Sequence, residues 1–412
     1  MKCRRIPKRL RRFLSNIGLL GAVTKALKDP RHRKGRQWAF GYLVDLLLTG
    51  ALVQARSLAE VERCSEQVSV RVPDSTLSYL LARIDPTPLR EVLRDNVRTI
   101  NRSKTLRPEG LPFGVLAIDG KTSWTGGHAA DDEAQRQGND FTLRWMRAVL
   151  TSARSRPCIN QDVIPAKTNE MGHFPTFWKA LRRAYSRADL FALVSLDAGY
   201  SSKQNAKIID DDGCGYLLRI KGEQPMLLAE MKRLLLPRAG QPEAASPWES
   251  VKGRQVQQRL VRRREIAGFD DWAHSRQTWL VQTVVRHKDG HEEVVMERYY
   301  LTNLLWNALS AKQILHVVRG HWSIENDCNW VLDVAWEEDT TAWATNAGRV
   351  ATHHPLRTLS WLRMLAYNVL GWLKRVRLRS RPTWSALRDA LRRVLLPIPS
   401  ATEMELELLP LG

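Results

Sequence analysis

"DLFALVSLDAGYSSKQNAKIIDDDGCGYLLRIKG", residues 189–222, predicts a buried strand, a helix and a second strand. The first apolar run ends at Asp197, and the last one, "YLLRIKG", is bounded by glycines. Short apolar runs bounded by turn residues are typical of buried strands. Gly213 follows the helical segment "SSKQNAKIIDDDG" and marks its end.

Upstream of this segment, the sequence predicts three more strands and a helix. "FGVLAIDGK" (residues 113–121), "MRAVLTSA" and "CINQDVIPA" are the strands, and "HFPTFWKALRRAY" is an amphipathic helix that starts near Pro175. Residues 124–143 are expected to form a mobile loop. Three strands, a helix, a strand, a helix and a strand make a mixed α/β sheet, in which sites gather at the strand ends.

Downstream, three strand-like segments predict a β-rich insertion: "QVQQRLVRRRE", "RQTWLVQTVVRH" and "EEVVMERYYLT". The last two are joined by "KDGH", a hairpin signal. The helical pattern resumes at the capping box of Ser310 and Gln313 and continues through "AKQILHVVRGHWSIENDCNWVLDV". Residues 319–339 are therefore expected to lie on a long helix.

Charge points to a polyanionic partner. The chain of 412 residues carries 64 Lys and Arg against 43 Asp and Glu, a net charge of +21. Residues 1–36 hold 13 Lys or Arg and one acid, Asp29. Nucleic acid is the partner that such a charge favours, because its neutralised phosphates release counterions. The following segments, to about Arg102, are helical, and they suit a helix-turn-helix unit and a plain helical bundle equally well.

Several protein classes are disfavoured. The five cysteines form no C-x-x-C pair, which argues for a reducing compartment and against a zinc module. The N-terminus lacks the apolar core of a secretory signal. The apolar run of residues 38–53 is short for a bilayer and contains Asp45, so a buried core helix is expected.

Three carboxylates are the candidates for chemistry: Asp119, Asp197 and Glu325. Carboxylates from separate elements can hold Mg²⁺ ions that act on both sides of a phosphodiester. Asp119 could instead begin a turn, and Asp197 could cap a helix. Glu325 is expected on an apolar helical face with Trp322 and Cys328, where an unpaired carboxylate is costly. Glu337, Glu338 and Asp339 are its rivals as the third ligand.

Five segments in order, "LAIDGKT", "LVSLDAGYSSKQNAKII", "YLLRIKGEQP", "RYYLTNL" and "RGHWSIENDCNWVLDVAWEED", resemble those of bacterial insertion-sequence transposases of the DDE superfamily. The nearest type is the ISAs-one-like group. The resemblance covers about residues 110–370. It implies an RNase H-like, retroviral-integrase-like fold with Asp119, Asp197 and Glu325 as the catalytic triad and as ligands of Mg²⁺ or Mn²⁺.

The helix of Glu325 departs from better-known relatives, which carry Tyr, Arg, Glu and Lys where this chain has Val318, His321, Glu325 and Leu332. The phosphate contacts that Arg and Lys make in those relatives are therefore expected from His321, from Arg319 or from other residues. The expected DNA-binding residues are Lys121, Arg262, Arg263, Arg264, Trp272, Arg319 and His321. Trp279 is expected in the core, and a solvated strand face is the alternative for the arginines.

The expected fold is an α/β, RNase H-like mixed sheet flanked by helices, with a β-rich insertion and a helical N-terminal domain. The expected units are a helical basic DNA-binding region (1–105), the first part of the catalytic domain (106–222), the insertion (223–304), the second part with the glutamate helix (305–378) and a C-terminal tail (379–412).

The expected function is transposition: metal-dependent cleavage of double-stranded DNA at terminal inverted repeats and strand transfer of the 3′-hydroxyls to target DNA. Two copies would meet in a synaptic complex. The expected location is the bacterial cytoplasm at the nucleoid, away from any membrane. The alternatives are an RNase H-fold endonuclease without strand transfer, a non-catalytic DNA-binding regulator, and an RNA-binding protein that no motif supports.

Overall fold

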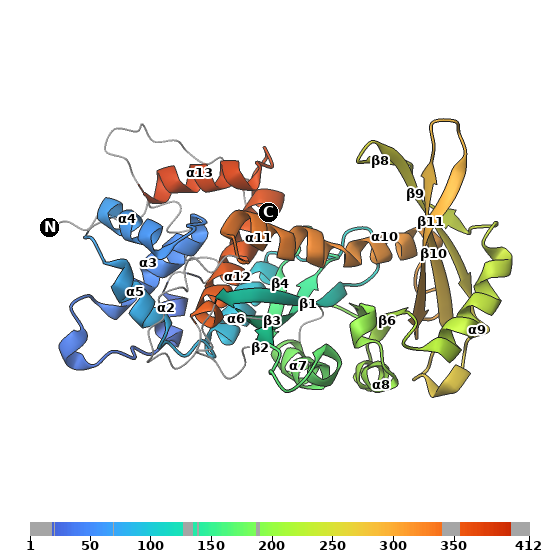
Figure 1. Ribbon diagram of the computed structural model, residues 1–412, viewed down its shortest axis with the longest axis horizontal. Coiled ribbons are helices and arrows are strands. Elements are labelled where there is room, and N and C mark those ends of the chain that lie inside the picture. The colour runs from blue at the N-terminus through green and yellow to red at the C-terminus, as the bar shows by residue number, and fades with distance from the viewer. Residues whose placement is uncertain are drawn as a thin grey trace.

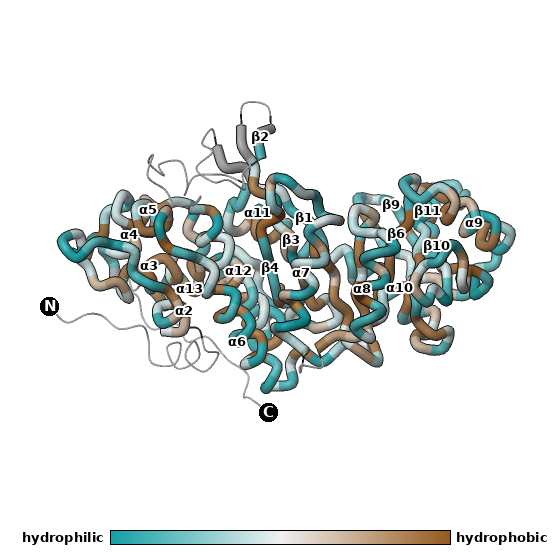
Figure 2. Tube along the Cα trace, turned by 90° about the horizontal axis from the view of Figure 1, so that it is seen from below, coloured by the Kyte–Doolittle hydropathy of each residue, from teal (hydrophilic) through white to brown (hydrophobic). Residues whose placement is uncertain are grey.

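The computed structural model describes residues 19, 21–68, 70–126, 135–137, 140–186, 190–339 and 355–396. These residues form an elongated molecule with helices at one end, a sheet in the middle and a β-rich region at the other end (Figure 1). The three parts lie in a row in the perpendicular view as well (Figure 2). No described helix is long and apolar enough to cross a membrane.

The helical end combines segments from both termini. Helix α3 (Phe40–Leu52) is the predicted core helix, and eight of its residues are buried. Two C-terminal helices pack against it, α12 (Leu356–Trp372) and α13 (Trp384–Leu395), so the two chain ends share one core. The other described helices of the N-terminal part are α2 (Ala22–Ala26), α4 (Leu58–Val68), α5 (Asp74–Leu81) and α6 (Leu89–Arg102).

The central sheet has the mixed topology expected of an RNase H-like fold. Strand β1 (Val115–Gly126) lies antiparallel to β3 (Asp140–Leu150), which pairs with β4 (Cys158–Val163). On its other side β1 is parallel to β5 (Leu193–Leu196), and β5 is parallel to β6 (Gly215–Ile220). Helices α7 (Glu170–Tyr185) and α8 (Lys203–Asp211) cover one face of the sheet (Figure 1).

The β-rich insertion continues the central sheet. Its last strand, β11 (Glu292–Thr302), pairs antiparallel with β6, and the order then runs through β10 (Gln277–Arg286) and β9 (Arg254–Arg263) to β7 (Ala244–Ala245). With the short strands β2 (Gln135–Gln137) and β8 (Glu249–Val251), the described residues form one 11-stranded sheet. The predicted hairpin joins β10 to β11, and Gly290 has the positive φ of 87° that the turn requires.

The predicted long glutamate helix consists of three pieces. Helix α10 (Ala311–His321) begins at the predicted capping box of Ser310 and Gln313, a π-helical segment, η5 (Ile324–Asn329), follows, and α11 (Trp330–Trp336) completes it. A π turn adds a residue and shifts the faces of a helix. Glu325 is exposed and Cys328 is buried, so the expectation that the two share an apolar face is wrong.

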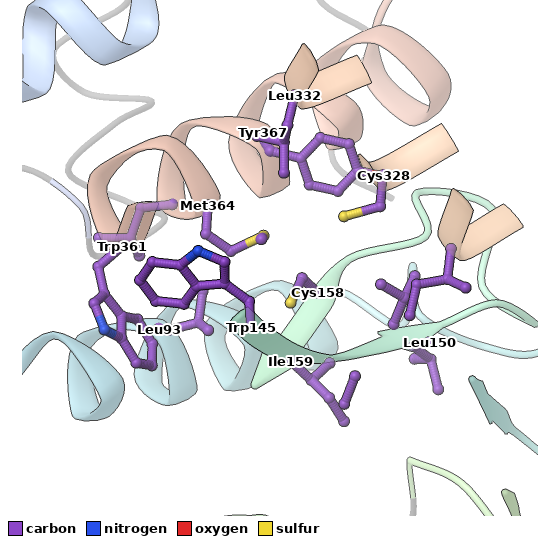
Figure 3. Close-up of a cluster of buried hydrophobic side chains, with 14 of the residues drawn as sticks. Leu93, Trp145, Leu150, Cys158, Ile159, Cys328, Leu332, Trp361, Met364 and Tyr367 are labelled. Carbon is purple, nitrogen blue, oxygen red and sulfur yellow. The ribbon is translucent and has the colours of Figure 1, made fainter. Parts of the chain in front are cut away.

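The inner face of this helix is fixed in the main core. Cys328 and Leu332 lie beside Tyr367 of α12, and the Cys328 sulfur faces Cys158 of the sheet (Figure 3). Cys328, Leu332 and Tyr367 are all 0% exposed. Close packing of this kind leaves a helix little freedom to slide or rotate, which fixes the place of Glu325 on the opposite, exposed face.

Two element boundaries differ from the predictions. Helix α7 begins at Glu170, five residues before Pro175, because the Asn169 side chain caps it by accepting a hydrogen bond from the backbone N–H of Gly172 at 2.8 Å. The segment expected to be a loop, residues 124–143, contains the end of β1, all of β2 and the start of β3. Its polar sequence has no strand-like alternation, so only backbone pairing reveals these strands. Residues 127–134 and 138–139 lie outside the described part.

Candidate active site

The fold brings the three predicted carboxylates to one edge of the sheet. Ile118 of β1 pairs with Leu196 of β5, so the next residues along the two parallel strands, Asp119 and Asp197, are neighbours. Asp119 lies within β1, where it pairs with Arg147 of β3, and Asp197 directly follows the end of β5. The π segment that carries Glu325 packs against β1. Burial raises the pKa of Asp119, and the charges of Glu325 and Asp197 add to that rise.

Asp119 is the carboxylate with the most perturbed ionisation. Burial raises the pKa of Asp119 to about 7, and the negative charges of Glu325, Glu170 and Asp197 add to that effect. A hydrogen bond from the backbone N–H of Gly120 opposes it. A buried carboxylate among like charges is costly to keep ionised.

Asp197 has cationic partners. Arg219 Nη1 lies 3.0 Å from Asp197 Oδ1, and Lys221 Nζ lies 3.7 Å from Oδ2. Burial alone would raise the pKa of Asp197, but a backbone hydrogen bond from Ala198 and the charges of Arg219 and Lys221 outweigh it and lower the pKa. Asp197 therefore remains an anion at neutral pH.

Glu325 lies between negative and positive neighbours. Burial, and then the charge of Asp197, raise the pKa of Glu325, whereas Arg219, Arg298 and Lys221 oppose the rise. The Arg298 guanidinium lies 4.8 Å from the ring centre of Trp322. These three cations were not predicted from the sequence, although Arg219 and Lys221 alternate at the end of "YLLRIKG" and Arg298 begins "RYYLTNL".

The three rivals of Glu325 have other partners. Arg56 pairs with Glu337 at 3.0 Å, Arg147 with Glu338 at 2.8 Å and Lys121 with Asp339 at 2.9 Å. Glu338 is 1% exposed. These ion pairs give the rivals structural roles and support Glu325 as the third member of the site.

His321, expected to contact phosphate, forms a hydrogen bond instead. Its Nδ1 lies 2.9 Å from Ser195 Oγ, which ties the helix of Glu325 to the strand of Asp197. Burial lowers the pKa of His321 to about 4, so the ring is neutral at pH 7 and carries no charge for a phosphate. In this arrangement His321 positions the two carboxylate-bearing elements.

The other expected DNA-binding side chains are spread over the molecule, and most are engaged. Lys121 is bonded to Asp333 at 2.6 Å as well as to Asp339. Arg319 donates two hydrogen bonds to Glu249 of β8, at 2.6 and 2.7 Å. Lys121 and Arg319 would each have to break an ion pair with a carboxylate before they could bind a DNA phosphate.

The arginines of β9 contact the insertion itself. Arg262 pairs with Glu243 at 2.7 Å, and Arg262 and Arg264 both lie over the Trp306 ring, at 3.9 and 4.4 Å. Arg263 donates a hydrogen bond to the carbonyl of Arg262 at 3.3 Å. These arginines were expected to repel one another unless a DNA phosphate lay nearby. In the structure, a carboxylate and an aromatic ring within the insertion offset that repulsion.

Of the two tryptophans considered for DNA stacking, neither is accessible. Trp279 is 0% exposed, which confirms its predicted place in the core. Trp272, expected to be the freer ring, is 4% exposed, so that expectation is wrong. Loop position in the sequence does not report burial, because a loop can fold back over the core it connects.

A groove of about 820 Å³ lies between the glutamate helix and the insertion. Lys312, His316 and Arg319 line it at successive turns of α10, together with Trp322. Ala245 and Pro247 of the insertion line it as well. Asp119, Asp197 and Glu325 are not among the residues that line this groove.

The chemistry of the carboxylates fits a hard divalent cation. All donors are oxygens. Burial, and then the negative charges of neighbouring carboxylates, raise the pKa values of Asp119 and Glu325, and a cation would offset both effects. Within the described ranges, no group of three or more Asp, Glu, His or Cys side chains is arranged so that it could hold a metal ion as it stands.

The chain is similar in sequence to several known proteins, and the similarities agree with one another. Residues 111–380 match the family described as "Transposase DDE domain". "Putative transposase YncI" of Escherichia coli O157:H7 is 26% identical over 264 residues, which cover 62% of this chain and 61% of that protein. "H repeat-associated putative transposase YhhI" of Escherichia coli (strain K12) is 23% identical over 269 residues, 62% of this chain and 64% of that protein. The chain thus spans less than two thirds of the length of these relatives.

Proposed function

This chain belongs to the transposase DDE domain family, and on that premise we propose that it is the DNA transposase of an insertion sequence. It cleaves DNA at the terminal inverted repeats of its element and joins the freed 3′-hydroxyls to target DNA. The observation that carries this proposal is the convergence of Asp119, Asp197 and Glu325, from two parallel strands and a packed helix, on one edge of the sheet.

Asp119, Asp197 and Glu325 would hold Mg²⁺ or Mn²⁺. Such ions, when bound, activate the attacking hydroxyl and stabilise the leaving oxyanion of a phosphodiester. The contribution of the chain is to fix the carboxylates. Parallel pairing of β1 and β5 fixes the two aspartates, and the bond between Ser195 and His321 fixes the glutamate helix against β5.

Positive charge for the DNA phosphates lies next to the carboxylates. Arg219, Lys221 and Arg298 lie near Asp197 and Glu325, and they supply the positive charge that relatives place at the positions of His321 and Leu332. Arg298→Ala is expected to weaken binding of repeat-end DNA, because the variant cannot donate a charge-assisted hydrogen bond to a phosphate. Unchanged affinity in a filter-binding titration would remove Arg298 from the DNA surface.

Cleavage of DNA that carries the inverted repeats flanking the gene tests the proposal. With Mg²⁺ the protein should nick these ends, and with EDTA it should not. Alanine at Asp119, Asp197 or Glu325 should abolish cleavage and leave DNA binding largely intact, because binding depends on phosphate electrostatics. Asp95→Ala, at an exposed acid on α6, is a matched control.

Two outcomes would count against the proposal. Cleavage within about tenfold of wild type for any one of the three alanine variants would remove that residue from the site, since losing a metal ligand costs more than this. A pre-cut end that is not joined to target DNA would favour the alternative of an endonuclease without strand transfer. Two copies are expected in the complex, because two element ends must be paired.

A further inference from the structure

A fourth carboxylate, Glu170, lies between the two aspartates. It is the first residue of α7, and its carboxylate reaches across to Gly120 within β1 and to Gly199 in the turn that follows β5. Glu170 Oε1 occupies the space that a Cβ on Gly120 would need, and Oε2 lies 2.9 Å from the corresponding position on Gly199. Gly120 directly follows Asp119, and Gly199 is two residues after Asp197.

The two glycines serve this close approach. Neither Gly120 nor Gly199 has a positive φ, so neither is needed for backbone conformation. At both positions, the Glu170 carboxylate is the group nearest to the place that a Cβ atom would occupy. The glycines therefore leave room for a carboxylate to insert between the two backbone segments that carry the aspartates.

The Glu170 carboxylate forms no hydrogen bond or salt bridge within the described part of the chain. Burial raises the pKa of Glu170, and the charge of Arg144 opposes that rise without cancelling it. Arg144 donates its hydrogen bond to the carbonyl of Thr168 instead. A half-buried carboxylate placed among other carboxylates is unfavourable unless a cation joins them.

A second, independent feature points to a ligand at this place. The Tyr200 hydroxyl lies 3.2 Å from the Cβ position of Gly120, next to Glu170, and Tyr200 is 1% exposed. Within the described residues this hydroxyl has no hydrogen-bond partner. A buried hydroxyl without a partner costs free energy, and it is satisfied when a ligand or a reoriented carboxylate accepts a hydrogen bond from it.

We infer that Glu170 is a fourth carboxylate ligand of the divalent-cation site, and that the Tyr200 hydroxyl donates a hydrogen bond to it in the cation-bound state. This inference rests on the proposed function, because it assumes that Asp119 and Asp197 hold the cation. Glu170 adds a negative charge between the two aspartates. The hydrogen bond from Tyr200 orients the Glu170 carboxylate toward the cation, although Tyr200 does not itself bind the cation.

Mn²⁺ binding by the full chain without DNA tests the inference, with the electron paramagnetic resonance signal of free Mn²⁺ as the readout. Glu170→Gln keeps the size of the side chain and removes its charge, and it should weaken Mn²⁺ binding about 10- to 100-fold. Tyr200→Phe should weaken binding in the same direction. Glu91→Gln changes an exposed glutamate in the first turn of α6 and should bind Mn²⁺ as wild type does.

Two further variants separate the possible failures. Asp119→Asn should also weaken Mn²⁺ binding; if it does and Glu170→Gln does not, the fourth ligand is wrong and the proposed function stands. If Asp119→Asn leaves binding unchanged, the triad site itself is wrong, and the inference fails with it. Gly199→Ala should reproduce part of the Glu170→Gln effect, because the added Cβ displaces Oε2. Equal circular dichroism in EDTA confirms that each variant folds.

Discussion

At the scale of single residues, His321 gives the structure a pH-dependent interaction. The folded pKa of His321 is lowered from 6.5 to about 4. Below about pH 6.5 the unfolded chain binds a proton on this residue and the folded chain does not, so the free energy of unfolding falls as the pH decreases toward 4. Above that window the contribution is constant.

His321→Asn keeps a hydrogen-bonding group for Ser195 and removes the titration. The wild type should lose more stability than this variant between about pH 7 and about pH 5, as measured by urea unfolding midpoints. If the difference between the two proteins is the same at both pH values, His321 does not titrate as its buried position requires.

The three carboxylates could be selected from the sequence because each stands at a recognisable place: each aspartate follows an apolar, strand-like run, and Glu325 lies within a motif. The structure places Asp119 within β1, not at its end, and Asp197 directly after β5. Glu170, Tyr200 and Ser195 were not predictable. A glutamate at a helix start or a serine in an apolar strand has an ordinary structural explanation, and only the three-dimensional arrangement shows what each one faces.

At the scale of elements, the glutamate helix is held by a buried ion pair near its end. Arg147 of β3 is 0% exposed and Glu338 is 1% exposed, with two N–O distances of 2.8 and 2.9 Å. Arg147 also donates a hydrogen bond to Asn329 of the π segment at 3.0 Å. The pair therefore connects the strand next to β1 with both ends of the segment that follows Glu325.

Breaking this pair should destabilise the protein strongly, because it leaves a buried charge. Arg147→Met should lower the free energy of unfolding by about 3 kcal/mol, at the lower end of the usual range since Arg363 also acts on Glu338. Glu338→Leu should cost more, because both arginines then lose their carboxylate. Urea unfolding would contradict this expectation if either variant stayed within about 1 kcal/mol of wild type.

Element type was predictable where hydrophobic periodicity was strong, as in β5, α8, β6 and the hairpin of β10 and β11. Two features of the fold could not be predicted from the sequence. The pairing of β11 with β6 makes the insertion part of the central sheet, and a long-range pairing leaves no local signal. The π turn at residues 324–329 changed the exposed face of the glutamate helix, since sequence periodicity assumes a regular α-helix.

At the scale of the whole molecule, the N-terminal part consists of a strongly basic segment followed by residues that belong to the hydrophobic core. Residues 2–18 contain seven Lys or Arg, whereas Val23 and Leu27 beyond them are 1% and 6% exposed and belong to the core. A test of the basic segment must therefore leave residues 19–36 intact, because their removal would disturb packing as well as charge.

Replacing the seven basic residues within residues 2–18 by Gln should weaken DNA binding and flatten its salt dependence. For every phosphate that the variant no longer neutralises, the slope of log K against log salt should fall in magnitude by about 0.9. Fluorescence anisotropy at several salt concentrations measures this slope. A slope equal to that of wild type would mean that these charges do not bind DNA.

The central claim, that Asp197 holds the catalytic cation, is tested most directly by changing the donor atom. Asp197→Cys replaces a hard oxygen ligand by a sulfur, which Mg²⁺ binds poorly and softer divalent ions accept. Cleavage of repeat-end DNA by this variant should be lost with Mg²⁺ and partly restored with Mn²⁺ or Cd²⁺, while the wild type cleaves with Mg²⁺. Cleavage by Asp197→Cys at the wild-type rate with Mg²⁺ would contradict the claim, because Asp197 would then hold no cation.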